Sequence, residues 1–215
     1  MNRPRGIDDL LSVLDLPAPV RADLLRRMSA PWRGYHDLRH LAVLWRRHRR
    51  YARTGPMRRP RIARLIAAAI LFHDAVLVPG ARDNEARSAA YWRQVAQRLP
   101  GFTRAEVDWV ADTILATADH LNAALPHGEP GAARLWMLDL DLTPIGEEAP
   151  TFARNGRNLR AEARHLDDAA WTEAQRAFLG RLRAAPRLLR HPRLHAAFEG
   201  RARENIGREL HRAAR

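Results

Sequence analysis

The sequence predicts an all-α protein with a single domain. Apolar residues recur at spacings of three, four and seven along almost the whole chain, as they do on one face of a helix. No segment alternates β-branched and polar residues with the period of two that indicates strands. The length of 215 residues favours one large domain, and no repeat, low-complexity tract or long linker divides it. We therefore expect one helical bundle over residues 1–215.

The first half of the chain predicts short helices followed by longer ones. Pro17 and Pro19 separate two short helices near the start of the chain. A longer helix is expected over about 38–51, ending before Gly55. The next, over about 61–75, contains the most apolar stretch of the sequence, which marks it as the central buried helix.

Capping signals and breakers place the remaining helices. An Asp-Asn pair at 83–84 can cap a helix that runs to Leu99. Thr103 with Glu106 forms a capping-box pattern that opens a helix continuing to about Ala124. The last part of the chain is expected to contain a loop over 126–131 and helices over about 132–142, 150–166, 172–185 and 193–213.

The charge of the chain is strongly positive. The formal net charge is +13, and all 37 basic residues are arginine. Alanine is abundant, whereas isoleucine and asparagine are scarce, which is the composition that a GC-rich genome produces. Codon usage therefore accounts for much of the charge, although a basic protein still favours anionic partners.

One segment is the best candidate for contact with nucleic acid. Residues 46–64 contain nine arginines, and no acidic residue lies between Asp37 and Asp74. Trp45 and Tyr51 supply aromatic rings among these charges. The competing interpretation is a solvated helix end and loop, and we favour it over a nucleic-acid interface.

Several classes of protein are excluded by composition. The absence of cysteine excludes disulfides, thiolate metal sites and a cysteine nucleophile. The longest uninterrupted apolar run, Leu65 to Phe72, is far short of the roughly 20 residues needed to cross a bilayer. Asp8, Asp9 and Asp15 interrupt any secretory segment after the first arginines. We expect a cytoplasmic protein without membrane association.

Histidine and aspartate residues occur where the helices are expected to be buried. His36 and His40 are four residues apart and share a helical face. His73 and Asp74 lie at the end of the most apolar helix, directly after Leu71 and Phe72. Burying such a pair is costly without a partner. A divalent cation is a suitable one, since imidazole and carboxylate bind Zn, Mn, Fe and Mg.

A third group lies in two other apolar segments. Asp139 and Asp141 occur in the stretch Leu-Trp-Met-Leu-Asp-Leu-Asp-Leu, and His120 closes an apolar helix. Each group has a plain structural explanation, as a helix terminus or a surface histidine. Three such groups within the most apolar segments nevertheless favour a metal site, because charged residues are scarce there.

Short motifs extend from about residue 31 to residue 210. In chain order they are Arg33-Gly34-Tyr35-His36 with His40-Leu41; Phe72-His73-Asp74; Asp83-Asn84-Glu85 with Ser88-Ala89; Thr117 with His120; Asp139-Leu140-Asp141-Leu142 with Gly146; Arg160 with Glu162; and Glu199, Ala202-Arg203 and Asn205. This order resembles the HD superfamily of metal-dependent phosphohydrolases. More specifically, the chain is similar to a bacterial group of predicted HD-superfamily hydrolases.

The resemblance implies an HD-type helical bundle that binds one divalent ion of Mn, Fe, Co, Ni, Zn or Mg. It favours His40 over His36, because apolar residues follow the first histidine of the superfamily on its helix. It favours Asp141 over Asp139, because the ligand aspartate directly precedes the leucine of this segment. The implied metal ligands are His40, His73, Asp74 and Asp141.

A metal-activated water attacking a phosphate ester is the chemistry expected of this set. Asp74 can bind the ion and orient the water. His120 and Glu85 are further candidate catalytic residues, and His36 is a candidate phosphate contact or proton donor. Glu85 has a plainer interpretation, since a carboxylate is favoured in the first turn of a helix.

Two arginines are placed near the motifs. Arg33 precedes the first histidine motif, and Arg160 lies close to Glu162. The guanidinium group suits bidentate binding of phosphate, so both are candidate substrate-binding residues. A salt bridge to Glu162 or to an aspartate is the alternative for each.

Three functions compete at this point. The first is a phosphohydrolase acting on a small phosphorylated substrate, with nucleotides among the candidates. The second is an HD-like regulatory module that binds a nucleotide without hydrolysing it. The third is an arginine-rich helical protein that binds nucleic acid without catalysis. The intact set of His40, His73, Asp74 and Asp141 favours the first.

Overall fold

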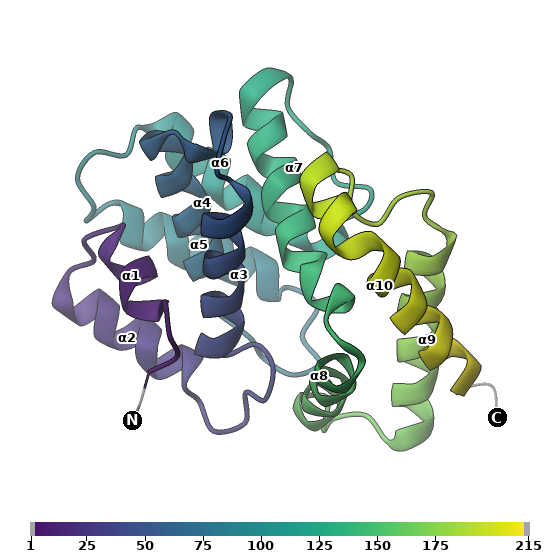
Figure 1. The fold of residues 1–215 in the computed structure, drawn as a ribbon. Coiled ribbons are helices and arrows are strands. Elements are labelled where there is room, and N and C mark those ends of the chain that lie inside the picture. Colours follow the sequence, from purple (N-terminus) through teal and green to yellow (C-terminus); the bar gives the residue numbers. More distant parts are fainter. Residues whose placement is uncertain (1–2, 213–215) are drawn as a thin grey trace.

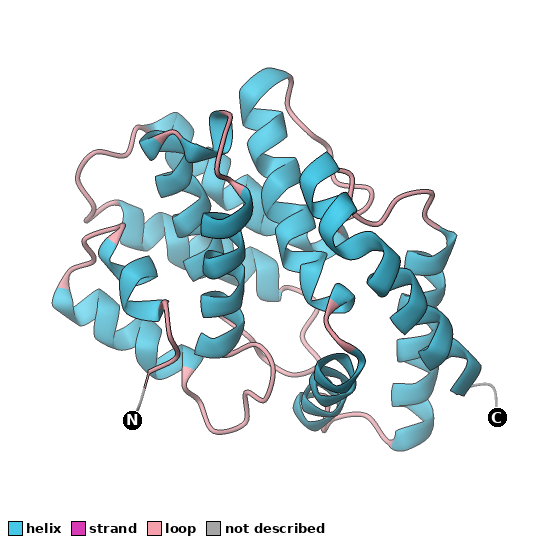
Figure 2. Cartoon of the chain, in the orientation of Figure 1, coloured by secondary structure: helices cyan, strands magenta, loops and turns pink. Residues whose placement is uncertain are grey.

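A computed structural model describes residues 3–212, and the predicted all-α class is confirmed. These residues form ten α-helices and three short 3₁₀ helices, with no strand among them (Figures 1 and 2). The α-helices are α1 (Ile7–Ser12), α2 (Ala18–Met28), α3 (Leu38–Tyr51), α4 (Pro60–Phe72), α5 (Asn84–Ala96), α6 (Arg104–Ala116), α7 (Gly128–Leu142), α8 (Ala149–Glu162), α9 (Asp168–Ala184) and α10 (Pro192–Arg212). The last residue of the final predicted helix, Ala213, lies outside the described residues.

The helix that opens at Thr103 is shorter than expected. The capping box is present, because the Thr103 hydroxyl accepts the Glu106 N–H and the Glu106 carboxylate accepts the Thr103 N–H. The α-helix ends at Ala116, and a 3₁₀ helix follows over Thr117–Asp119. The Thr117 hydroxyl donates to the Ile114 carbonyl, which occupies one acceptor at the helix end. His120 therefore lies beyond α6, at the start of a loop.

The predicted loop over 126–131 lies partly inside α7, which begins at Gly128. Pro130 fits the first turn, because backbone N–H groups have no partner there in any helix. Gly131 is required by close packing, since a Cβ atom at this position would lie 1.7 Å from the Pro126 carbonyl oxygen. Proline and glycine thus mark the start of α7 rather than a break before it.

α4 is the central buried helix, as predicted. Every residue from Ile66 to Phe72 is fully buried. The helix packs against α3, α5, α6 and α7, and Figure 1 shows it inside the group formed by the first six helices. The apolar core also includes residues of α1 and α2, such as Leu10 and Leu24.

The C-terminal helices form the other side of the molecule. α10 packs against α9 and against the 3₁₀ helix Thr143–Gly146 that follows α7 (Figure 1). Asn205 donates to the carbonyls of Ile145 and Glu147, both at 2.8 Å. Gly146 lets α10 approach this segment closely, since a Cβ atom at position 146 would lie 2.6 Å from the Phe198 carbonyl oxygen. These contacts fix the chain where it leaves α7 towards α8.

Within residues 3–212, no helix combines the length and the apolar character that crossing a membrane requires.

Candidate metal centre

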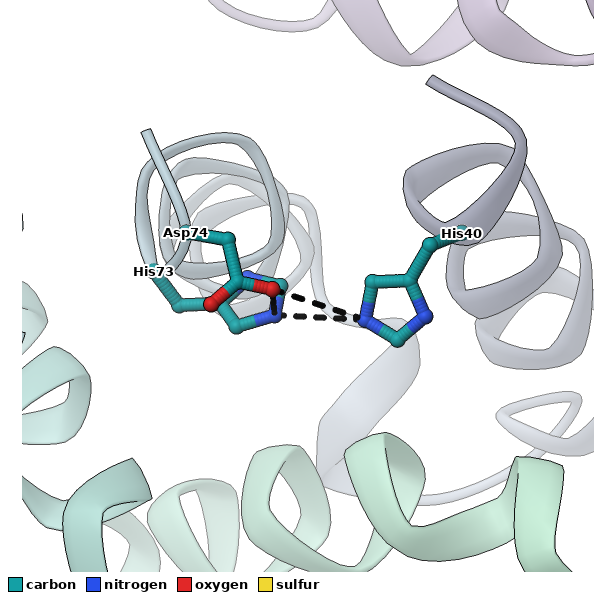
Figure 3. Close-up of side chains that lie close together, drawn as sticks. All are labelled: His40, His73 and Asp74. Atoms are coloured by element: carbon teal, nitrogen blue, oxygen red, sulfur yellow. Dashed lines mark hydrogen bonds and ion pairs between the residues drawn. The ribbon is translucent and has the colours of Figure 1, made fainter. Parts of the chain in front are cut away.

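His40, in the first turn of α3, lies close to His73 and Asp74, which follow the last residue of α4 (Figure 3). The Nε2 atoms of His40 and His73 are 3.3 Å apart, and the Asp74 Oδ2 atom lies 2.9 Å from His73 Nε2 and 3.9 Å from His40 Nε2. Both rings are buried. This His-His-Asp group could hold a metal ion.

Local interactions aim these side chains at one another. The Asp37 carboxylate accepts the backbone N–H groups of Arg39 and His40, which starts α3 and places His40 in its first turn. His73 follows the last residue of α4, and its Nδ1–H donates to the Ile70 carbonyl at 3.0 Å. A ring nitrogen held in this way leaves Nε2 as the nitrogen available to an ion.

α7 adds one of its two aspartates to the group. Asp141 Oδ1 lies 3.0 Å from His40 Nε2 and 3.5 Å from His73 Nε2. Asp139 is fully buried elsewhere and accepts the backbone N–H of His191 at 2.5 Å, while Arg190 lies 3.6 Å from it. Burial raises the pKa of Asp139 to about 6. Of the two carboxylates that the sequence leaves as alternatives, Asp141 is the one beside the histidines.

The spacing of these atoms suits a single ion. Ligand atoms about 2.0–2.2 Å from an ion lie about 3.0–3.5 Å from their neighbours in octahedral or tetrahedral coordination. Four of the separations at this site, 2.9, 3.0, 3.3 and 3.5 Å, are close to that range, and the separation between His40 and Asp74 is longer, at 3.9 Å. Nitrogen and carboxylate oxygen donors together suit Mn, Fe, Co, Ni or Zn, whereas Mg prefers oxygen alone.

The electrostatics of the cluster favour a cation. Burial alone would raise the pKa values of the two carboxyl groups, but His73 and the neighbouring histidines hold the pKa of Asp74 and that of Asp141 well below the usual range. Burial likewise opposes the charged form of His73, yet Asp74 and Asp141 raise its pKa well above the ordinary value. Both carboxylates are therefore ionised and attract positive charge, which protons on the imidazoles or a divalent ion can supply.

His36 is paired with a carboxylate far away in the sequence. Its Nδ1 atom lies 2.6 Å from Glu162 Oε2, and Glu162 Oε1 accepts the backbone N–H groups of Tyr35 and His36 at 2.8 and 2.9 Å. Burial lowers the pKa of His36, but the carboxylates of Asp74 and Glu162 outweigh it and raise the pKa overall. Sequence reasoning did not assign this role to Glu162. The only signal was its place in the Arg160–Glu162 motif.

His120 lies in the loop after α6, next to the cluster of His40, His73, Asp74 and Asp141 that we call the metal cluster. Its Nε2 atom is 2.8 Å from Asp141 Oδ2. Its carbonyl accepts a hydrogen bond from Arg190 at 2.8 Å, and Arg190 also lies near Asp139. The imidazole is thus held by Asp141 and the backbone by Arg190, which fixes His120 from both sides.

Arg33 has hydrogen-bond partners within the protein. Its guanidinium donates to the carbonyls of His36 and Asp74, both at 2.8 Å, and the side chain is buried. Arg33 therefore holds together the two segments that carry these residues. The two terminal nitrogens of the guanidinium group thus have carbonyl partners, whereas its buried Nε atom has none among the described residues, and substrate binding by Arg33 stays a prediction.

Arg160 and Glu85 also lie away from the cluster. Arg160 pairs with Asp168 at 2.7 Å and donates to the Ala163 carbonyl, so a salt bridge forms, though with Asp168 rather than Glu162. Glu85 stands half-buried in the first turn of α5. Neither side chain is among the described residues that line the pocket next to the cluster. Their geometry fits the plainer alternatives for both.

A pocket of about 330 Å³ opens beside the metal cluster. His36, His40, His120 and Asp141 line one part of it. The remaining wall is largely apolar and comes from the segment after α7 and from α8 and α9. The cluster is therefore accessible to a small ligand from one side.

Most arginines of segment 46–64 have partners within the protein. The acidic partners come from distant parts of the sequence, which explains why the segment looks unpaired when read alone. Arg47 pairs with Glu147, Arg49 with Asp9, Arg59 with Glu129 and Arg61 with Glu106, while Arg46 and Arg64 donate to backbone carbonyls. This arrangement agrees with the solvated interpretation, and binding of nucleic acid remains an untested prediction.

Comparison with known proteins adds no independent assignment of this centre. No protein-family model and no curated protein matches the chain. The functional interpretation accordingly rests on the residues and their geometry.

Proposed function

We propose that the protein is a metal-dependent phosphohydrolase that hydrolyses a phosphate ester, in keeping with its resemblance to the HD superfamily. One observation carries this proposal. The ligand atoms of His40, His73 and Asp74 lie 2.9–3.9 Å from one another, and Asp141 Oδ1 lies 3.0 and 3.5 Å from the two histidines, at one side of a pocket large enough for a small substrate. A purely structural ion would not need such an accessible side.

The donor set matches the charge of the ion. Two neutral imidazoles and two carboxylates neutralise a divalent cation and leave further coordination positions. Such an ion, when bound, lowers the pKa of water from about 15.7 toward 7 and polarises a phosphoryl oxygen.

The protein's own residues supply orientation and proton transfer. Glu162 holds His36 through Nδ1, so Nε2 is the ring nitrogen available to a ligand in the pocket. A protonated His36 can donate that proton to the departing alkoxide. Asp141 holds His120 at the same pocket, where its ring can contact the phosphoryl group. Asp74, whose Oδ2 atom lies beside His73 and His40, would accept a hydrogen bond from the attacking water.

The function is tested by a pair of buried aspartates on one helix. Asp141→Ala should lose the bound metal and phosphatase activity, because it removes a ligand. Asp139→Asn should keep both, since an amide oxygen can still accept the His191 N–H. Metal analysis of the purified variants is followed by a screen of phosphate esters, nucleotides included, with Mn, Fe, Co, Ni, Zn and Mg.

Absence of a stoichiometric metal in the parent protein, with no effect of Asp141→Ala, would contradict the proposal. Nucleotide binding without hydrolysis under all six metals would instead indicate the regulatory module. Tight, salt-dependent association with DNA or RNA that is lost when Arg46, Arg47, Arg49 and Arg50 are replaced would indicate a nucleic-acid-binding protein.

A further inference from the structure

Resting on the proposed function, we infer that the substrate is a phosphomonoester whose leaving group is uncharged, largely apolar and about the size of one fused ring system. The pocket beside the metal centre carries this inference. Its composition, its size and the partners of the nearby arginines each support one part of it.

Apolar side chains from two helices form the far wall of the pocket. Phe152 and Leu159 come from α8, and Trp171, Phe178 and Leu179 from α9. Phe178 is 43% exposed, which places an aromatic ring at the surface next to the pocket without burying it in the core. An apolar ligand would cover this surface, and flat aromatic rings suit stacking on tryptophan and phenylalanine.

Two amide side chains supply the polar contacts of this wall. Asn155 and Gln175 line the pocket, and neither makes a side-chain hydrogen bond to another described residue. Each offers a donor and an acceptor to a bound molecule. A leaving group with one or two neutral polar atoms therefore fits as well as a hydrocarbon does.

A substrate with several phosphates does not fit this pocket. The chain has 37 arginines, yet none of those described lines it. Arg39, Arg46 and Arg154 line a neighbouring hollow instead. Of these, Arg39 is bound to Asp37 and Arg46 to the Arg5 carbonyl, while Arg154 makes no such bond to another described residue but lines the neighbouring hollow and not this pocket. Phosphate groups beyond the one at the metal centre would lack cationic partners.

The volume sets the size of the leaving group. Ligand pockets commonly measure about 300–1,000 Å³, and the value of 330 Å³ lies at the small end. One fused ring system can occupy such a space, whereas a dinucleotide or an extended chain cannot.

A matched pair of glycines provides the test. Gly156 lines the pocket from α8, and Gly200 lies on the exposed side of α10. A Cβ atom at either position meets no atom within 4 Å, so a side chain added at either glycine starts from open space. Gly156→Leu adds bulk where the leaving group is expected, and Gly200→Leu adds the same bulk elsewhere.

The full-length, metal-loaded protein is assayed with naphthylmethyl phosphate, glycerol 3-phosphate and ATP. The first two are esters of alcohols of similar acidity, so intrinsic reactivity does not set their order. We expect kcat/KM for naphthylmethyl phosphate to exceed that for the other two by about tenfold or more. Gly156→Leu should remove this preference and spare glycerol 3-phosphate, while Gly200→Leu should change neither. A preference for ATP or glycerol 3-phosphate, or an equal loss for both monoesters in Gly156→Leu, overturns the inference.

A binding measurement separates failure of the pocket from failure of the chemistry. Naphthalenemethanol, the product alcohol, is titrated against metal-free protein and followed by isothermal titration calorimetry. Binding that Gly156→Leu weakens about tenfold and Gly200→Leu does not weaken supports the pocket, even where no ester is hydrolysed and the proposed function fails. The absence of binding to the parent protein overturns the inference.

Discussion

Two buried histidines on α3 have opposite surroundings. His40 and His48 are eight residues apart on one helix, and their exposed fractions are 6% and 3%. His40 faces His73, Asp74 and Asp141. His48 lies between two tryptophans. Its ring stacks on Trp45 with 5.1 Å between the ring centroids, and its Nδ1 atom accepts the Trp136 indole N–H at 3.1 Å.

The difference shows that the partners, rather than burial, decide what a histidine can do. Burial and the nearby Arg49 lower the pKa of His48 to about 4, so this ring is neutral and serves as a hydrogen-bond acceptor in the core. Around His40, carboxylates from α7 and from the end of α4 create a site that attracts a cation. One ring stabilises the fold, and the other is suited to bind metal.

The largest effect on activity is expected from replacing His40, the α3 histidine of the metal cluster. His40→Ala should lower phosphatase activity by about 10³-fold or more and abolish stoichiometric metal binding, since an ion contributes several kcal/mol to the transition state. The variant also loses the contact of His40 with Asp141 and gains a cavity, so the unfolding free energy of the metal-free protein should fall as well, and metal content and activity separate this variant from His48→Ala. Metal analysis, steady-state kinetics and urea unfolding check these outcomes. Full metal occupancy in the variant would remove the contrast with His48.

His48→Ala should lower the stability of the protein without changing metal binding or activity. It leaves a cavity and an unpaired Trp136 N–H in the core, which costs about 2–4 kcal/mol of unfolding free energy. Metal content and kcat per folded molecule should stay at parental values. Urea unfolding monitored by circular dichroism measures the loss, and a change below about 1 kcal/mol would contradict a structural role.

The pH dependence of stability should also reveal His48. Its pKa is about 4 in the folded protein and near 6.5 when unfolded, so the unfolded chain binds more protons between these values. The stability from a neutral His48 is fully present above about pH 6.5 and is lost as the pH falls towards 4, by about 3 kcal/mol. His48→Gln keeps an acceptor for Trp136 and does not titrate. Its unfolding free energy should therefore fall less over the same range, and parallel curves would contradict the assignment.

The smallest of these effects extends the comparison to His36, which also depends on a distant partner. Glu162→Gln keeps an acceptor for the backbone N–H groups but removes the charge beside His36. Activity should fall about 10–100-fold, and the alkaline limb of the pH–rate profile should move to lower pH, because the pKa of His36 is no longer raised by this carboxylate. Asp168→Asn, which removes an exposed carboxylate from Arg160, should leave the profile unchanged. An unshifted profile in Glu162→Gln would assign Glu162 a purely structural role.

Local sequence signals predicted much of the fold. The period of the apolar residues places the helices, and the capping box at Thr103 forms as expected. The same signals misplaced the end of α6 and the start of α7. Helix ends depend on contacts such as that between Gly131 and Pro126, which the local pattern does not contain.

The candidate site followed from sequence only in part. The placement of His73 and Asp74 at the end of the most apolar helix predicted that they lie at the core. In the structure α4 ends just before His73, which is buried, and Asp74 is partly buried. The sequence left Asp139 and Asp141 as alternatives. Two residues on α7 point in different directions, and only the packing of α7 against α3 and α4 brings Asp141 to the histidines. The sequence suggests phosphate as a partner of Arg33, and only the folded chain shows that its guanidinium also donates to the carbonyls of His36 and Asp74.

The sequence by itself determined the helical class, the buried position of α4 and the residue types of a metal site, because these depend on composition and on periodicity along one chain. Tertiary structure decided which of those residues meet. The Glu162 partner of His36 lies 126 residues away, and the acids that pair with the arginines of segment 46–64 come from other helices. The apolar pocket beside the centre is likewise formed by α8 and α9 together. Contacts between distant segments depend on the packing of whole helices, and no local spacing in the sequence encodes them.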